Sequence, residues 1–243
     1  MPHSPSIDIA GSAFYGAFRV ITRREFVTGA SALAIAAALS TGAELSLMTQ
    51  AFAQATPSNA DLMQAGPLGE MSMGKDDAPV TVIEYASMTC PHCASFHTKT
   101  YPEMKKRYID TGKVRYILRE FPFDPLSAGA FMLARCAGKD NKDRYFAVVE
   151  TLFQQQPRWA DPNVKNPAEP LFAIVRQAGF TKESFESCLR DQKMLDGIEA
   201  VRDRGAKTLG VQSTPTFFIN GKQFRGALSI EDLEKAIEPL LKS

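Results

Sequence analysis

The stretch Cys90-Pro91-His92-Cys93 lies where a predicted strand gives way to a predicted helix. Residues 80–85 form a short apolar run typical of a buried strand, and residues 94–110 carry helical spacing that ends at Thr111-Gly112. The pattern therefore predicts that the two cysteines open the helix. Two thiols separated by two residues can close a small ring and reopen it, which is redox chemistry.

The predicted position at the start of a helix favours the thiolate form of Cys90. Unpaired backbone N–H groups and the positive end of the helix dipole stabilise negative charge there, and His92 adds to this when it is protonated. A stabilised thiolate is a good leaving group, so the dithiol gains stability relative to the disulfide and the disulfide becomes an oxidant. We therefore expect Pro91 and His92 to set the direction of thiol exchange.

A Cys-x-x-Cys pair is also half of a zinc knuckle, so a structural metal site is the alternative to a redox pair. The remaining cysteines, Cys136 and Cys188, are single and distant, and neither has a histidine nearby. The second half of a knuckle is therefore missing. We expect no metal site and no cofactor.

The rest of the chain predicts strands on either side of a long helical segment. Residues 71–73 are a candidate edge strand, and residues 113–120 alternate as a strand does, which completes one βαβ unit. Helical patterns then follow without an intervening strand, at residues 126–138, 144–155, 170–179, 181–190 and 194–210.

The C-terminal part predicts a hairpin followed by a helix. Residues 216–219 and 222–225 are strand-like, and Asn220-Gly221 between them is a type I′ turn signal. Ser229 with Asp232 is expected to cap a final amphipathic helix that runs through Leu241.

Composition and charge exclude several classes of protein. The 243 residues are 44% hydrophobic and 23% charged, which is typical of a globular chain rather than a disordered one. Formal net charge is +1 and the basic residues are scattered. We therefore expect neither a nucleic-acid partner nor a polybasic membrane patch.

The N-terminus predicts export. Arg23 and Arg24 precede a weakly apolar run at residues 30–39, and small residues follow at 51–55. The paired arginines are similar to a twin-arginine signal, and a general-secretory signal is the alternative. The apolar run is shorter than the ~20 residues that span a bilayer. We expect residues 1–55 to be a signal cleaved near Ala53 or Ala55, residues 56–67 to be a flexible lead-in, and the mature protein to be periplasmic.

This element order, with the dithiol at the first helix and Thr214-Pro215 directly before the hairpin, resembles the thioredoxin fold. The helical segment inside it resembles the DsbA family of bacterial thiol:disulfide oxidoreductases, in its alphaproteobacterial branch. Cys-Pro-His-Cys is typical of those oxidants, whereas thioredoxins usually carry Gly-Pro between the cysteines. The resemblance implies an α/β, thioredoxin-like fold at residues 68–123 and 211–243, with an inserted all-helical domain at 124–210.

The resemblance also implies roles for residues outside the motif. Glu84 stands where the family places a buried acidic group beneath the disulfide, which can take up and return a proton; a partly exposed glutamate at a strand end is the alternative. The bond before Pro215 is expected to be cis, which packs this proline against the cysteines and leaves backbone groups of Thr214 free to pair with a substrate. His97 is expected to be exposed and solvated.

Two further groups of residues are assigned less directly. Four apolar residues are expected either to line a substrate surface near the dithiol or to belong to the core, namely Phe121, Phe123, Met132 and Trp159. In an oxidising compartment, Cys136 and Cys188 are expected to form a disulfide that closes a loop of about 50 residues. Two unpaired core thiols are the alternative.

The predicted function is that of a periplasmic dithiol oxidase, which donates its Cys90–Cys93 disulfide to reduced exported proteins. The resemblance implies reoxidation by a DsbB-like, quinone-linked membrane partner, and we expect a monomer. One alternative is a disulfide isomerase or reductase, which usually needs a dimerisation domain or a reducing partner, and the lead-in is too short for such a domain. The other is a non-enzymatic metal-binding or interaction protein.

Overall fold

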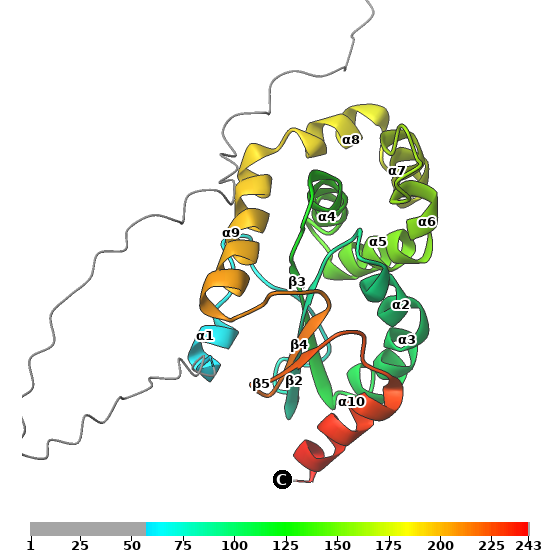
Figure 1. Ribbon diagram of the computed structural model, residues 1–243. Coiled ribbons are helices and arrows are strands. Elements are labelled where there is room, and N and C mark those ends of the chain that lie inside the picture. The colour runs from blue at the N-terminus through cyan, green and yellow to red at the C-terminus, as the bar shows by residue number, and fades with distance from the viewer. Residues whose placement is uncertain (1–56, 243) are drawn as a thin grey trace, which may run out of the picture. The chain divides into compact units, whose positions relative to one another are not determined.

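The computed structural model describes residues 57–242, in which a five-stranded sheet carries helices on both faces (Figure 1). The strand order is β1-β3-β2-β4-β5; β2 and β3 are parallel, and the other neighbouring strands are antiparallel. The strands are β1 (Met71–Met73), β2 (Val80–Ala86), β3 (Val114–Glu120), β4 (Thr216–Ile219) and β5 (Lys222–Arg225). The predicted export signal and its cleavage sites lie outside the described residues.

The helices fall before, between and after the strands. They are α1 (Asn59–Met63), α2 (Pro91–Lys99), α3 (Tyr101–Met104), α4 (Pro125–Ala137), α5 (Lys142–Gln154), α6 (Gln156–Trp159), α7 (Ala168–Val175), α8 (Lys182–Leu189), α9 (Gln192–Thr208) and α10 (Ile230–Ile237). Shorter helical turns are the π-helix η1 (Lys105–Ile109) and the 3₁₀ turns η2 (Arg176–Ala178) and η3 (Glu238–Leu241). The six helices α4 to α9 separate β3 from β4, so the helical segment interrupts the sheet where the sequence predicts it.

Alternation along β2 assigns its side chains to two different cores. Val82 belongs to the larger core, whereas Ile83 and Tyr85 belong to the smaller core on the other face of the sheet. Glu84 has the same parity as Val82, so its side chain enters the larger core. Helix α2, which carries Cys93, packs on that same face. The strand therefore brings a carboxyl group beneath the helix that begins at the dithiol.

The helix predicted over residues 94–110 is broken in the structure. Helix α2 ends at Lys99, and α3 and η1 follow after Thr100. Pro102 lies in the first turn of α3 and has no backbone N–H to donate to the preceding turn. The break therefore has a local cause.

The segment predicted to be a flexible lead-in contains helix α1. Ser58 caps this helix, because its side chain accepts a hydrogen bond from the backbone N–H of Asp61. Leu62 is buried in the smaller core together with Val201 of α9. Leu62 in this core, together with hydrogen bonds that Arg204 donates to the Asp61 and Gln64 carbonyls, holds the segment. A five-residue element is too short for a helical period to appear in the sequence.

A buried ion pair fixes the first inserted helix to the sheet. Arg135 of α4 binds both carboxylate oxygens of Glu120 at the end of β3, at 2.6 and 3.0 Å. The Tyr145 hydroxyl of α5 donates to the same carboxylate at 3.1 Å. Because a bidentate pair restricts both distance and orientation, these contacts fix α4 and α5 relative to β3.

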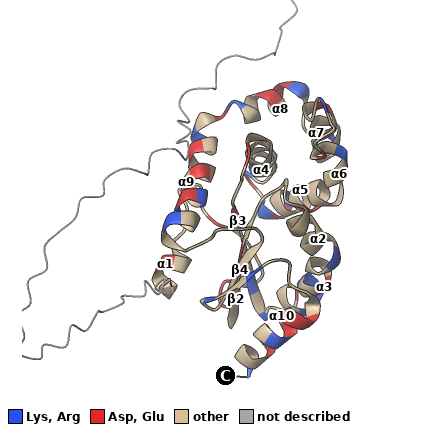
Figure 2. Cartoon of the chain, viewed as in Figure 1, with Lys and Arg blue, Asp and Glu red and all other residues tan. Residues whose placement is uncertain are grey.

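Helices α8, α9 and α10 each carry both acidic and basic residues (Figure 2). Among residues 57–242, no helix has both the length and the apolar character that crossing a membrane requires.

Candidate functional site

The two cysteines of the motif differ in exposure. Cys90 is the N-cap residue of α2, and Pro91 occupies the first turn of the helix. The Cys90 side chain is half-buried, whereas Cys93 is 0% exposed and lies in the larger core. Both sulfurs are free. Only Cys90 therefore offers a sulfur that a second molecule can reach.

The two thiols also differ in acidity. A hydrogen bond from Cys93, aided by backbone N–H groups at the start of α2 and opposed by burial, lowers the pKa of Cys90 from 9.0 to about 5. Burial raises the pKa of Cys93 well above its ordinary range, and the nearby charges of Cys90 and Glu84 add to this effect. At neutral pH the reduced pair therefore holds a Cys90 thiolate and a Cys93 thiol.

The loop before β4 brings Thr214 against the dithiol. The Thr214-Pro215 peptide bond is cis, and the Cys90 sulfur lies 3.3 Å from the Thr214 carbonyl oxygen, to which it donates in its thiol form. The Thr216 hydroxyl donates to the Ser213 carbonyl at 2.7 Å, which holds the loop. The predicted substrate-binding backbone and the nucleophile, 124 positions apart in the chain, are thus in contact.

Side chains from α4 and α6 hold the loop that leads into the motif, and the sequence analysis did not identify them. The Ser127 hydroxyl accepts from the Met88 backbone N–H at 2.9 Å. The Gln156 amide donates to the carbonyls of Met88 at 2.7 Å and Cys90 at 3.0 Å. Single serine and glutamine residues on helices carry no pattern, so nothing local in the sequence marks these contacts.

Glu84 and His97 meet beneath α2. Glu84 is 0% exposed, so the alternative of a partly exposed strand-end residue is wrong. His97 is 3% exposed, and its Nε2 lies 3.2 Å from Glu84 Oε2. The expectation that His97 is solvated is therefore wrong. His97 follows Cys93 by four positions, so both side chains lie on the face of α2 that meets the sheet. His92, by contrast, is exposed.

The four candidate apolar residues divide between core and surface. Phe121, Met132 and Trp159 are buried. Phe123 is 58% exposed and contacts Phe121 edge to face, with ring centroids 5.4 Å apart. Its neighbour Asp124 accepts a hydrogen bond from Thr89, directly before Cys90, so only Phe123 of the four is exposed near the dithiol.

Cys136 and Cys188 form a disulfide that joins α4 to α8, with an S–S distance of 2.12 Å. Cys136 lies at the C-terminal end of α4, while Ser127 and its contacts to the dithiol loop lie at the N-terminal end. Cys136 follows Ser127 by nine positions in the helix, a rise of about 14 Å. An influence of this disulfide on the dithiol would therefore act through the length of α4.

Comparisons with known proteins agree with this geometry. The thioredoxin family model matches residues 68–239. A Rickettsia prowazekii protein named "Putative protein-disulfide oxidoreductase RP025" is 37% identical over 172 residues, which cover 71% of this chain and 61% of the relative. The match thus spans about three fifths of that protein's length.

Two solved structures have the same fold. Wolbachia pipientis α-DsbA1 is 30% identical and superposes with a TM-score of 0.70, covering 76% of this chain and 96% of that one. Oxidised BdbD from Bacillus subtilis is 26% identical with a TM-score of 0.63, covering 77% and 97%. The predicted α/β, thioredoxin-like fold with a helical insertion is confirmed. This chain belongs to the thioredoxin family, in its DsbA-like group.

Proposed function

We propose that this protein is a thiol:disulfide oxidoreductase that oxidises dithiols in other proteins with its Cys90–Cys93 disulfide. The observation that carries the proposal is the contrast between the two sulfurs, one reachable and acidic, the other buried with a raised pKa. Such a pair receives a nucleophile at one sulfur and releases the electron pair on the other. The names of the rickettsial relative and of the α-DsbA1 structure support this assignment.

In the proposed reaction, a substrate thiolate attacks the Cys90 sulfur of the disulfide. The Cys90–Cys93 bond breaks, a mixed disulfide forms at Cys90, and the electron pair leaves on Cys93, which takes up one proton. A second substrate thiolate then attacks the substrate sulfur of the mixed disulfide, and Cys90 leaves as a thiolate. The substrate loses two electrons and two protons; the enzyme keeps both electrons and one proton, and the other proton goes to solvent.

The low pKa of Cys90 favours this direction. Stabilising the Cys90 thiolate stabilises the dithiol, so the disulfide gives up its oxidising equivalents readily. The Thr214 carbonyl beside Cys90 supports a role in substrate binding, since an extended chain with its own N–H groups can donate to that oxygen. In this proposal, Pro91 and the exposed His92 adjust how readily Cys90 is released as a thiolate. Glu84 takes up and returns a proton beneath the disulfide, on the side of Cys93.

We further propose that the protein acts in the periplasm as a monomer, on exported proteins, after removal of residues 1–55 near Ala53 or Ala55. A DsbB-like, quinone-linked membrane protein would reoxidise it. The proposed domain division is a thioredoxin-like part at residues 68–123 and 211–243 and a helical insertion at 124–210. The Arg23-Arg24 pair and the apolar run at residues 30–39 support the export step.

The test is a single-turnover reaction between the oxidised protein and a reduced dithiol peptide. The proposal predicts one peptide disulfide formed per protein molecule, with Cys90 and Cys93 reduced, and no reaction by Cys90→Ala. Reduction of insulin by the dithiol form, without peptide oxidation by the disulfide form, would instead support the reductase alternative.

A further inference from the structure

Gln156, the first residue of α6, uses all of its donor capacity on the loop that carries the dithiol. Its amide nitrogen donates to the carbonyl oxygens of Met88 at 2.7 Å and Cys90 at 3.0 Å. An amide NH₂ group has two N–H bonds, and the two carbonyls occupy both. They also decide which amide atom is the nitrogen, since an oxygen in that place would face two acceptors. One hydrogen-bonding group of Gln156 is left, the carbonyl oxygen Oε1.

This Oε1 atom is an acceptor without a partner at the protein surface. It accepts no hydrogen bond from residues 57–242. The buried side-chain atoms that lack a partner in this part of the chain belong to four other residues, Glu84, His97, Arg115 and Thr214. Oε1 is therefore not closed off in the core but in contact with solvent. Because it shares a carbon with the nitrogen that contacts Cys90, it lies beside the first cysteine of the motif.

Helix α6 is anchored so that this oxygen stays in place. Trp159 of α6 is 0% exposed, and its indole N–H donates to the Leu152 carbonyl of α5 at 2.9 Å. Pro157 follows Gln156 directly, and its ring fixes one backbone angle at the start of the helix. Gln156 is thus held from both ends, by α6 and by the dithiol loop. An acceptor that is already ordered costs little entropy when a ligand binds.

The opening at Cys90 therefore has acceptors from two separate parts of the chain. The Thr214 carbonyl oxygen, from the loop before β4, is 3.3 Å from the Cys90 sulfur. Gln156 Oε1 comes from the helical insertion. Both oxygens can accept hydrogen bonds and neither can donate, so the ligand that fits them must supply N–H groups. The main chain of an extended polypeptide does so at every residue except proline.

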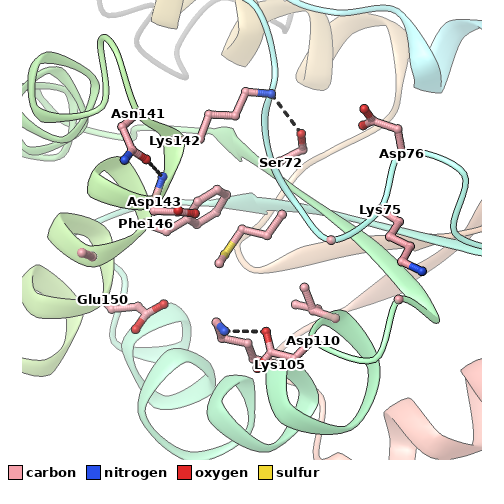
Figure 3. Close-up of a pocket in the computed structure, with 15 residues that line it drawn as sticks. Ser72, Lys75, Asp76, Lys105, Asp110, Asn141, Lys142, Asp143, Phe146 and Glu150 are labelled. Atoms are coloured by element: carbon pink, nitrogen blue, oxygen red, sulfur yellow. Dashed lines mark hydrogen bonds and ion pairs between the residues drawn. The ribbon is translucent and has the colours of Figure 1, made fainter.

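The open pocket of about 860 Å³ beside η1 and the start of α5 lies apart from this opening. Charged residues of both signs line it, and Figure 3 shows Lys105 bound to Asp110, with Glu150 on the same side. No residue of the dithiol loop, of the loop before β4 or of α6 is among its lining residues. This pocket therefore supplies no contact at the reacting sulfur, and a chain joined to Cys90 meets Thr214 and Gln156 instead.

We infer that Gln156 binds the main chain of the substrate, with Oε1 accepting a hydrogen bond from a backbone N–H near the substrate cysteine. The inference rests on the proposed function for its substrate class, a polypeptide with a reactive thiol. The contact holds the substrate chain against α6 while the mixed disulfide at Cys90 exists. Because nearly every residue has a backbone N–H, the contact adds affinity without selecting a side chain. Binding of this kind suits an enzyme whose substrates differ in sequence.

The test measures how strongly a peptide is held at Cys90 in Cys93→Ala, which has no second cysteine to release it. Protein carrying glutathione at Cys90 is mixed with a peptide that has one cysteine. The peptide thiolate attacks the Cys90 sulfur, a protein–peptide disulfide forms, and glutathione leaves as a thiolate. The equilibrium constant of this exchange is read by mass spectrometry. A series of peptides has one backbone N–H near the cysteine replaced by N-methyl at a time.

The inference predicts one peptide position at which N-methylation depends on Gln156. There it should weaken the complex of Cys93→Ala roughly three- to tenfold more than that of Cys93→Ala with Gln156→Met, which has no oxygen to lose a partner. Gln156→Lys should behave as Gln156→Met does, because lysine has N–H donors for the two carbonyls but no acceptor. It also replaces Gln156→Met if that variant does not fold.

Gln154→Met is the matched control, since Gln154 is exposed, lies two positions before Gln156 and makes no hydrogen bond to residues 57–242. It should keep the N-methyl profile of the Cys93→Ala protein. Equal profiles for the Gln156 variants and for Gln154→Met at every peptide position would overturn the inference. The exchange needs only the Cys90 thiol, so it is informative whichever direction the native pair runs. Peptide oxidation by the native disulfide, measured separately, reports on the proposed function.

Discussion

The acidity of Cys90 should depend on the Cys93 thiol, and replacing Cys93 by alanine or serine tests this dependence. The hydrogen bond from Cys93 is the largest cause of the low Cys90 pKa, about 5 against an ordinary 9.0. Alanine removes the donor, whereas serine keeps one. We expect the Cys90 pKa to rise in Cys93→Ala and to stay lower in Cys93→Ser.

The expected size follows from the energy of one hydrogen bond. A bond to a charged group contributes about 1.5–3 kcal/mol, and one pKa unit corresponds to 1.36 kcal/mol, so the loss is about one to two units. Cys90 is only half-buried and solvent screens part of the effect, so we expect the lower end. Cys93→Ala should therefore have a Cys90 pKa of about 6, between the native value and that of a free thiol.

The assay is alkylation of the variants by iodoacetamide as a function of pH, read by mass spectrometry. The quantity to measure is the pH at the midpoint of the rate profile, because the rate at a single pH does not report the Cys90 pKa. At pH 7 a thiol of pKa about 5 is almost wholly ionised and one of pKa 9.0 is about 1% ionised. Nucleophilicity falls with pKa, with a Brønsted slope of about 0.4–0.5, which offsets most of that advantage. Equal midpoints for the two variants would refute the reasoning.

The remaining predictions concern the reaction pathway, the second disulfide and the loop that holds the motif. Cys93→Ala should accumulate mixed disulfides with disulfide-bonded proteins on non-reducing gels, because the Cys90 thiolate attacks their disulfides and no second cysteine releases the product, whereas Cys90→Ala should form none; the reverse pattern would show that the two roles are exchanged. The double variant Cys136→Ser, Cys188→Ser should lose about 4 kcal/mol of unfolding free energy in denaturant titrations, from the chain entropy of a 52-residue separation, yet retain peptide oxidation. Loss of oxidation in a folded double variant would indicate that this pair relays electrons. Gln156→Ala should lower stability by about 1–3 kcal/mol, because it leaves the buried Met88 carbonyl unpaired, whereas the Cys90 carbonyl keeps the Ala94 N–H; an unchanged denaturation midpoint would count against that role.

The parts of the fold that the sequence predicts well are those that local chemistry determines. Asn220 and Gly221 both adopt positive φ, 41° and 90°, which a type I′ turn requires and few other residues tolerate. Ser229 and Asp232 form the expected capping box at the start of α10. The helix that begins at Cys90 could be predicted from the strand pattern before it and the helical pattern after it alone.

The placement of distant residues is less accessible from the sequence. The contact between Cys90 and Thr214 was predicted from resemblance to a family, since no periodicity relates positions 124 residues apart. His97 was misassigned because a polar residue with helical neighbours looks solvated. Its burial arises from Phe153 and Glu84, which come from two other elements.

The most direct test of the central claim is the equilibrium of the Cys90–Cys93 pair with glutathione at pH 7. Lowering the Cys90 pKa from 9.0 to about 5 stabilises the dithiol by at most about 2.7 kcal/mol at this pH, or ~60 mV, and solvent screening reduces the figure. This stabilisation is largest above pH 9, is partly present at pH 7 and is lost as pH falls through about 5. The account predicts a pair more oxidising than thioredoxin by up to ~60 mV. A potential near the −270 mV or so of thioredoxin would contradict it.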